Sequence, residues 1–416
     1  MNKLGKHIIE KFLFVLLLLL PLHLVQFEIA SALFIVLSIL YLNNRNQKIS
    51  GNFITTILPL LLIFTLGTAT LFFYSYSNWD IARDIAYFLK PILLLFLGYA
   101  LIHKIKDPNF IFQVFVYLGL AFAIWHIYNI ITFPELFNTS INIIRNSTGL
   151  SNHVELLALV FLIISLKYPD IQIFKEKRTI YYALGLLGIS FILYFSRTMW
   201  IAVFILLLTS FGYAKITLKA LKYISLFVLL IVSFYIYLYS IDIRRNEPGI
   251  STFLYKMKIA PEEIFLPKVD LNDHASLWDH WRAYEAKMAL DQMSGFQHLV
   301  GRGFGSQVDL LFVAPLDEKG MRYISHLHNG YILIYYKTGI IGLLFYLLFI
   351  LHLYLHTFSK KEIYQTRPIN HLISAIGIYL FFSTLIISGI YNTSSIYTLL
   401  LGALLAQYDR LKLIRI

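Results

Sequence analysis

The chain alternates between long apolar runs and short polar breaks along nearly its whole length. Most of these runs approach the ~20 residues that a helix needs to cross the hydrocarbon core of a bilayer. The pattern therefore predicts an all-α polytopic membrane protein. Twelve membrane-spanning helices are expected, over residues 8–25, 28–43, 53–74, 85–103, 110–132, 152–167, 179–195, 199–214, 218–241, 338–356, 369–391 and 393–408.

Composition supports this class. Of the 416 residues, 58% are hydrophobic and 14% are charged, whereas a soluble domain has about 45–50% apolar and about 25% charged residues. The chain contains no cysteine, which excludes disulfide bonds and sites built on a thiolate nucleophile or thiolate metal ligand. The opening stretch "MNKLGKHIIEKFLFVLLLLLPLHLV" resembles a signal peptide, but no small-x-small cleavage site follows it. We interpret it as the first span.

The distribution of positive charge predicts the orientation. The formal net charge is +12, a value that raises the question of a nucleic-acid partner. With the N-terminus placed in the cytoplasm, most Lys and Arg residues fall in cytoplasmic connectors, while the short outer connectors carry only Arg83, Arg145 and Arg197. This asymmetry follows the positive-inside rule. The basic excess therefore indicates topology, with both termini cytoplasmic, and no nucleic acid is expected.

One connector, residues 242–337, is far longer than the others and rich in Trp, His, Asp and Arg. Within it, "SLWDHWRAYEAKMALDQM" predicts a helix with Trp281, Tyr284 and Met288 on one face. Three regions are thus expected: spans one to nine over 1–241, a periplasmic loop with helices over 242–337, and spans ten to twelve with a cytoplasmic tail over 338–416.

The outer arginines are candidates for chemistry because topology disfavours positive charge on that side. Arg197 joins two spans through a few polar residues, and its alternative role is a snorkelling helix end. Arg145 lies in a longer outer loop and has Glu155 as a possible ion-pair partner. Arg282 lies on the predicted loop helix, where Asp279 three residues before it and Glu285 three residues after it offer an ordinary solvated salt bridge.

The stretch "HLHNGYILIYYKTGIIG" places a histidine directly before the tenth span. Gly339 and Gly342 allow a sharp turn and close helix packing, and Lys337 is expected to be an interfacial anchor. A neutral His328 can accept a proton from a sugar hydroxyl or donate a hydrogen bond to a phosphate, although a polar cap is the alternative. A metal site on His326 and His328 lacks a third ligand at a suitable spacing.

These residues resemble a known family. His328-Asn329, nine residues, then Gly339-x-x-Gly342 matches the H-[NSQ]-x9-G-x-x-G pattern of bacterial O-antigen ligases. The ligases share a superfamily with O-antigen polymerases and protein O-oligosaccharyltransferases. The resemblance covers nearly the whole chain, including twelve spans and one large loop between the ninth and tenth.

The resemblance implies a GT-C-like fold in the bacterial inner membrane with its active site on the periplasmic face. The donor would be a glycan on undecaprenyl diphosphate, and the acceptor a sugar hydroxyl of lipid A-core, in lipopolysaccharide biosynthesis. Transfer would be inverting and would need no metal, nucleotide or other cofactor. Membrane lipids would be the remaining partners.

The resemblance also implies roles for residues. Arg197 and Arg282 match the family's arginines and His328 the motif histidine, which makes these three the predicted catalytic set. The predicted substrate-binding set is Arg145, Asn329, Glu155 and His326, with Glu155 also the reserve base. Arginine forks suit this chemistry because a diphosphate leaving group gains negative charge as the anomeric bond breaks.

Three alternatives remain open. The turn "GRGFGS" at 301–306 resembles a glycine motif of polymerase-like members, and its amides can face an anion, although a plain turn is favoured. An O-antigen polymerase, which joins lipid-linked repeat units, is thus the nearest alternative to a ligase. A lipid-linked glycan transporter is a third class, supported only by Lys90-Pro91 within a span.

Overall fold

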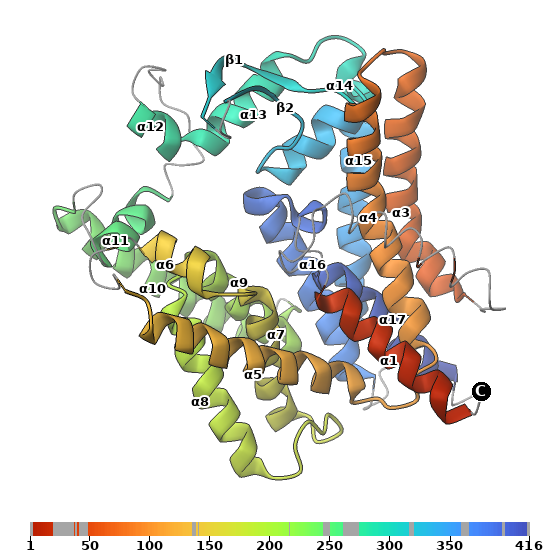
Figure 1. The fold of residues 1–416 in the computed structure, drawn as a ribbon, viewed down its shortest axis with the longest axis vertical. Helices are drawn as coiled ribbons and strands as arrows, with labels where there is room; N and C mark the ends of the chain where they lie inside the picture. The colour runs from red at the N-terminus through yellow and green to blue at the C-terminus, as the bar shows by residue number, and fades with distance from the viewer. Residues whose placement is uncertain are drawn as a thin grey trace.

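The computed structural model describes residues 3–19, 37, 40, 49–134, 139, 141–215, 217–243, 250–260, 274–315, 320–358, 366–392 and 396–413. Within these residues the fold is almost entirely helical, with one two-stranded sheet. Figure 1 shows two groups of helices, with the sheet at one end of the molecule.

The first group, called the core bundle below, joins helices from both ends of the chain. Its members are α1 (Lys3–Leu19), α3 (Gly51–Ala69), α4 (Asn78–Ile102), α15 (Gly330–Leu355), α16 (Arg367–Ile387) and α17 (Ile396–Leu413). α4 packs along α17, while α15 packs against both α3 and α16. Phe88, Leu95 and Tyr99 of α4 are almost fully buried because the helix lies between neighbours.

The second group, called the second bundle, comes from the middle of the chain. It comprises α5 (Phe110–Ile131), α6 (Ile141–Thr148), α7 (Asn152–Lys167), α8 (Lys177–Leu193) and α9 (Arg197–Leu208). α5 packs on α7 and α8, and α9 packs on α16. The contact between α9 and α16 therefore joins the two bundles.

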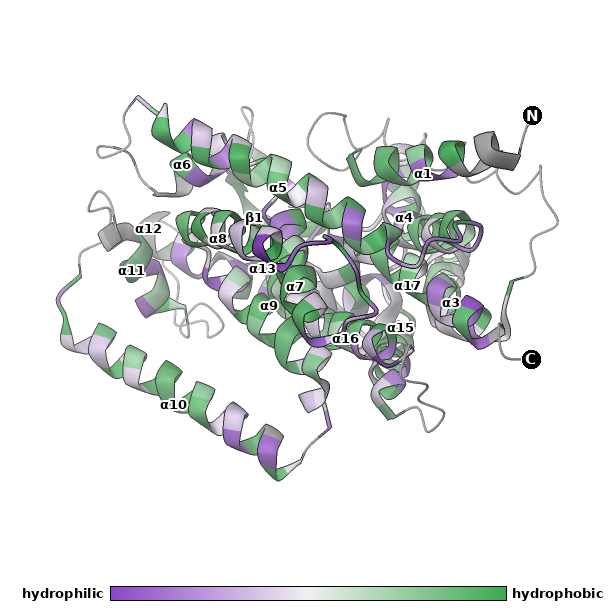
Figure 2. Cartoon of the chain, turned by 90° about the horizontal axis from the view of Figure 1, so that it is seen from below, coloured by the Kyte–Doolittle hydropathy of each residue, from purple (hydrophilic) through white to green (hydrophobic). Residues whose placement is uncertain are grey.

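α10 (Leu218–Ser240) lies at the edge of the molecule in Figure 2. It packs on α11 (Ile250–Ile259) and meets α9 through the stacked rings of Phe227 and Phe204. Large apolar side chains such as Leu229, Leu230 and Ile236 are exposed on it. A helix that is apolar on all sides and makes few protein contacts is suited to a lipid environment.

The segment after α11 contains α12 (His274–Asp279), α13 (Trp281–Asp291), α14 (Gln297–Val300), β1 (Val308–Ala314) and β2 (Met321–Ile324). The strands pair antiparallel, with Val308 opposite Ile324 and a bulge between Asp309 and Ala314. The expectation of one helix over "SLWDHWRAYEAKMALDQM" was wrong, because the chain leaves the helix at His280 and α13 starts at Trp281.

Short helical turns complete the described secondary structure. They are 3-10 turns and one π turn, at Thr70–Phe72, Thr209–Tyr213, His356–Phe358 and Gly389–Tyr391.

All the predicted spans except 28–43, which lies almost entirely outside the described residues, overlap helices. Six described helices are long and apolar enough to cross a membrane: Gly51–Phe72, Asn78–Ile102, Phe110–Ile131, Leu221–Ser240, Gly330–Phe358 and Arg367–Ile387. These helices agree with the predicted helical membrane class. The count of twelve and the orientation stay predictions.

The helix that contains the predicted tenth span begins earlier than that span. We expected the span to begin at 338, after Lys337, but α15 begins at Gly330 and is kinked at Gly339, where φ is +64°. The error came from treating Lys337 as an interfacial anchor. Lys337 is fully buried and forms an ion pair with Asp84 of α4, so its charge does not mark the membrane boundary.

The glycine turn 301–306 fastens the segment that runs from α12 to β2 to the core bundle. Its amides bond to protein groups: those of Arg302 and Gly303 donate to carbonyls of α15, and the amide of Gly305 donates to Asp84 Oδ2 at 2.7 Å. The Lys337 ammonium donates to the Ser306 carbonyl. The favoured interpretation of a structural turn is therefore confirmed for these amides.

Candidate active site

His328 lies in the short loop between β2 and α15, and its side chain is 49% exposed. Its Nδ1 is 2.9 Å from Oε2 of Glu285, and its backbone N–H donates to the same oxygen at 3.1 Å. Its carbonyl accepts from the Ser388 amide at 2.9 Å. The loop thus presents the ring to the outside while fixing its backbone on both sides.

Glu285 is the site residue that sequence analysis missed. It lies on α13 and is 3% exposed, and its second oxygen accepts from Trp281 Nε1 at 2.5 Å. The sequence contained a signal, since Glu285 shares the buried face of α13 with Trp281, Tyr284 and Met288. The alternative of a solvated salt bridge between Arg282 and Glu285 is wrong, because the Glu285 carboxylate bonds to His328 and Trp281.

His326 faces inward, unlike His328. Its Nε2 lies 3.0 Å from the Tyr87 hydroxyl and 2.9 Å from Ser388 Oγ, and its ring packs on Tyr87. Burial lowers the pKa of His326 to about 3, with smaller contributions from the positive charges of His328 and Lys337. A ring that stays neutral between two hydroxyls suits a support for the His328 loop.

Asn329 and Gly330 anchor that loop to the bundle. Asn329 is the N-cap of α15, with Oδ1 accepting from the amides of Tyr331 and Ile332 at 3.0 and 3.3 Å. A Cβ at Gly330 would lie 2.7 Å from Ser388 Cα, so the close crossing of the two turns requires glycine. The motif residues after His328 therefore fix where the histidine stands.

Arg197 begins α9, and its Nη1 donates to the backbone carbonyl of Lys256 in α11. Arg145 lies on α6, and its pKa is lowered by burial and then by the positive charge of Arg197. Among the residues that the structure describes, no carboxylate forms an ion pair with Arg145. Two partly buried arginines whose positive charges act on each other in this way favour a bound anion.

Glu155 bonds to residues of α8, next to the turn that leads to Arg197. It is buried on α7 and accepts hydrogen bonds from Ser190 and from the Tyr194 hydroxyl, the latter at 2.7 Å. The expected alternative of a pair between Glu155 and Arg145 is therefore wrong. Tyr194 immediately precedes the turn that leads to Arg197, so Glu155 stabilises the α8–α9 connection.

Arg282 lies on α13, half-buried, one turn before Glu285. The same helix therefore carries one predicted arginine and the carboxylate that holds His328. α13 is itself fixed to the sheet, because the Tyr284 hydroxyl donates to the Leu310 carbonyl at 2.6 Å.

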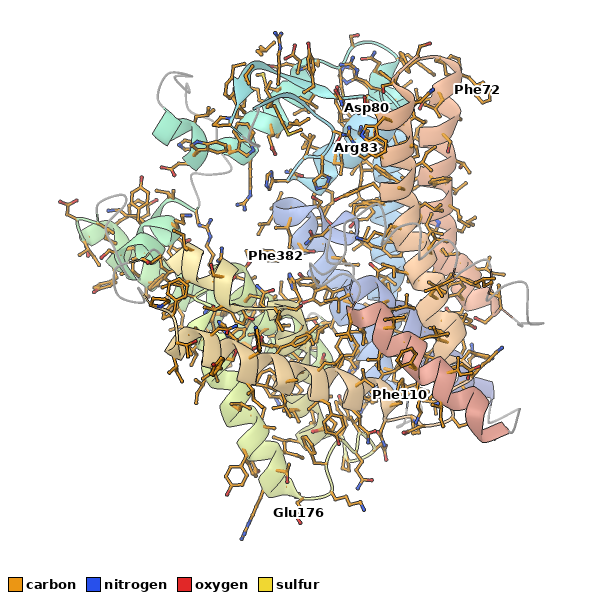
Figure 3. All side chains as sticks on the ribbon, viewed as in Figure 1. Phe72, Asp80, Arg83, Phe110, Glu176 and Phe382 are labelled. Atoms are coloured by element: carbon orange, nitrogen blue, oxygen red, sulfur yellow. The ribbon has the colours of Figure 1, made fainter. Side chains whose placement is uncertain are left out.

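α16 connects the two parts of the site. A small apolar cavity lies between it and α9, lined by residues that include Thr198, Met199, Phe382 and Ile386. Figure 3 shows Phe382 on α16 near the centre of the molecule. Ser388, which caps the end of this helix, binds the His328 loop. α9, which carries Arg197, and the His328 loop are thus both supported by α16.

The model of the O-antigen ligase family matches residues 182–347. The matched region runs from α8 to α15 and includes Arg197, Arg282, Glu285, His326 and His328, whereas Arg145 and Glu155 precede it. No curated protein matches the chain.

Proposed function

We propose that this chain, whose residues 182–347 match the model of the O-antigen ligase family, is an O-antigen ligase. The enzyme would transfer a glycan from undecaprenyl diphosphate to a sugar hydroxyl of lipid A-core. We further propose that the reaction occurs at the periplasmic face of the inner membrane, where residues 242–337 meet spans 1–241 and 338–416.

The observation that carries the proposal is the arrangement around α16: the exposed His328 is held on its end through Ser388, and α9, which begins at Arg197, packs along it. The positive charge of Arg145 also interacts with that of Arg197. Two neighbouring guanidinium groups repel each other, and an anion between them turns that repulsion into attraction. A diphosphate offers several oxygens to such forks, and these contacts are stronger in the reduced dielectric near a bilayer.

The bond changes follow from these positions. An oxygen of the acceptor sugar attacks the anomeric carbon of the donor, and its proton passes to Nε2 of His328. The bond from the anomeric carbon to the phosphate oxygen breaks, and undecaprenyl diphosphate leaves with the electron pair. Arg197 and Arg282 hold the diphosphate as its charge grows, and Arg145 adds a third positive charge. Attack opposite the leaving group inverts the anomeric configuration.

The test is reconstitution of the purified protein with labelled undecaprenyl-diphosphate glycan, with and without lipid A-core. Transfer of label to lipid A-core, with no growth of the donor when acceptor is omitted, is the expected result. A ladder of longer lipid-linked chains without acceptor would instead identify a polymerase. Absence of transfer both to lipid A-core and to another lipid-linked glycan would contradict both enzyme assignments and favour a transporter.

The residue roles are tested in the same assay. Because a general base and a charged clamp each contribute about 10²-fold or more, His328→Ala and Arg197→Ala are expected to lower kcat by at least that factor. His298→Ala and Arg322→Ala are matched controls, since these side chains lie on α14 and β2 and bond to Tyr335 and Asp309. Near-normal turnover of either folded test variant would remove that residue from the mechanism.

A further inference from the structure

We infer that Glu285 is the positioning residue that holds His328 as the Nδ1–H tautomer and aims Nε2 at the acceptor hydroxyl. The inference rests on the proposed role of His328 as the base. It adds a residue that neither the family pattern nor the sequence analysis singled out for the reaction.

Three donors converge on the Glu285 carboxylate. The indole N–H of Trp281 donates to Oε1 at 2.5 Å, while the backbone N–H and the Nδ1 of His328 lie 3.1 and 2.9 Å from Oε2. The indole and the backbone amide can only donate. A carboxylate accepts at both oxygens, so it is the side chain that satisfies this arrangement when Nδ1 carries the proton.

Proton placement on Nδ1 leaves Nε2 as an acceptor. In the part of the chain that the structure describes, Nε2 of His328 has no hydrogen-bond partner, and the side chain is 49% exposed. A neutral imidazole takes up a proton at the nitrogen that carries none, and the bond at the other nitrogen decides which one that is. The geometry therefore leaves the outward nitrogen ready to accept the hydroxyl proton.

The negative charge of Glu285 adds a second effect. Its side chain is 4% exposed, so the carboxylate is shielded from water. When His328 receives the proton, the new positive charge lies beside this carboxylate, and their attraction is stronger than it would be in water. The buried charge of Glu285 is thus offset most fully in the state that forms during transfer.

Further hydrogen bonds hold both α13, which carries Glu285, and the loop that carries His328. The contact between Glu285 and His328 is therefore a fixed feature of the fold. Gln292, just after α13, bonds to both the amide and the carbonyl of Asp309 in β1, and the Ser388 amide holds the His328 carbonyl. Since Arg282 lies on the same helix as Glu285, α13 aligns the diphosphate clamp and the base with one rigid element.

The first test is the tautomer of His328 in the wild-type protein. Histidine labelled with ¹⁵N is incorporated, and His328→Gln assigns the signal in nanodiscs at a pH where the ring is neutral. A protonated Nδ1 with a bare Nε2 is the expected result. A protonated Nε2 would overturn the inference without any change to Glu285, and this outcome does not depend on whether the protein transfers glycan.

The second test is Glu285→Gln. The amide of glutamine has one donor end, so it meets either Trp281 or His328 with a donor facing a donor. We expect loss of the uniform Nδ1–H signal and a ~10–100-fold fall in kcat, with KM for donor and acceptor within ~twofold of wild type. Unchanged kcat or an unchanged His328 signal would contradict the positioning role.

Two controls separate this role from a merely structural one. Asp291→Asn changes an exposed carboxylate at the end of the same helix that pairs with Lys287, and should leave activity and tautomer unchanged. Trp281→Phe removes the other donor to Glu285 while keeping the carboxylate on His328. If Trp281→Phe reproduced the full loss, Glu285 would act only by supporting α13. Absence of glycan transfer by the wild-type protein would refute the proposed function itself, which the tautomer result would not. Normal turnover by His328→Ala would remove His328 from the mechanism.

Discussion

The positive charge of Arg145 lies in surroundings that destabilise the ionised form of its side chain. Burial and the neighbouring charge of Arg197 both lower its pKa, so the free protein gains nothing from ionising this group. Such a group is explained by a ligand of opposite charge, because binding then removes the unfavourable term. Mutation of Arg145 should therefore affect the stability of the free protein and the affinity for the diphosphate donor in different ways.

We predict that Arg145→Gln leaves the thermal midpoint of the free protein unchanged or raised, while KM for the diphosphate donor rises ~10-fold or more. The second value follows from the loss of one charge-assisted hydrogen bond, about 1.5–3 kcal/mol. Thermal unfolding and donor titration of the same preparations provide both measurements. A lower midpoint with unchanged donor KM would instead make Arg145 a structural residue.

Sequence analysis found the residues whose charge conflicts with their surroundings. Arg145, Arg197 and His328 were visible because topology and hydropathy disfavour them. Glu285 was not recognised, because helix spacing alone offers Arg282 as a surface partner as readily as a buried role. Distinguishing the two required knowing that the loop carrying His328 folds back onto α13, a contact between residues 43 apart in the chain.

At the scale of elements, the kink in α15 determines where His328 lies. Gly339 has φ +64°, and a Cβ there would lie 2.2 Å from the Leu299 carbonyl oxygen of α14. The first turns of α15 therefore diverge from the later ones and carry the His328 loop with them. The kink also lets α14 cross close to the backbone of α15.

We predict that Gly339→Ala destabilises the protein by about 2–4 kcal/mol, from backbone strain and the clash with Leu299 combined. Activity should fall as well, because straightening α15 moves His328. Gly188→Ala is the matched control, since Gly188 lies within α8 with no atom in the path of a Cβ, and alanine favours a helix there. Equal thermal midpoints for the two variants would refute the role of the kink.

The elements themselves were only partly visible in the pattern. Apolar runs gave the helices, but not their true ends where a charge is buried, as with Lys337 at the start of the tenth span. The strands β1 and β2 were missed because "VDLLFVA" is a short apolar run that hydropathy alone does not assign to strand or helix. The segment is a strand because it pairs with β2, across the bulge between Asp309 and Ala314.

At the scale of the whole molecule, the glycine turn 301–306 docks on a buried ion pair inside the core bundle. Asp84 of α4 accepts from Lys337 of α15 and from the Gly305 amide, and Lys337 also donates to the Ser306 carbonyl. Three chain segments far apart in sequence thus share one polar cluster inside an apolar bundle. Removing one charge leaves the other buried without its partner, which costs about 3–5 kcal/mol.

We predict that Asp84→Asn and Lys337→Met each lower the thermal midpoint strongly and expose the adjacent Arg302 to trypsin. The double variant should lose less stability than the two single losses together, because neither buried charge then remains unpaired. Thermal midpoints and the rate of cleavage at Arg302 measure the global and the local effects. Lys287→Met is the control, since its pair with Asp291 is exposed and should contribute at most about 1 kcal/mol. Additive losses in the double variant, or normal protection of Arg302 in the single ones, would mean that the glycine turn docks independently of this pair.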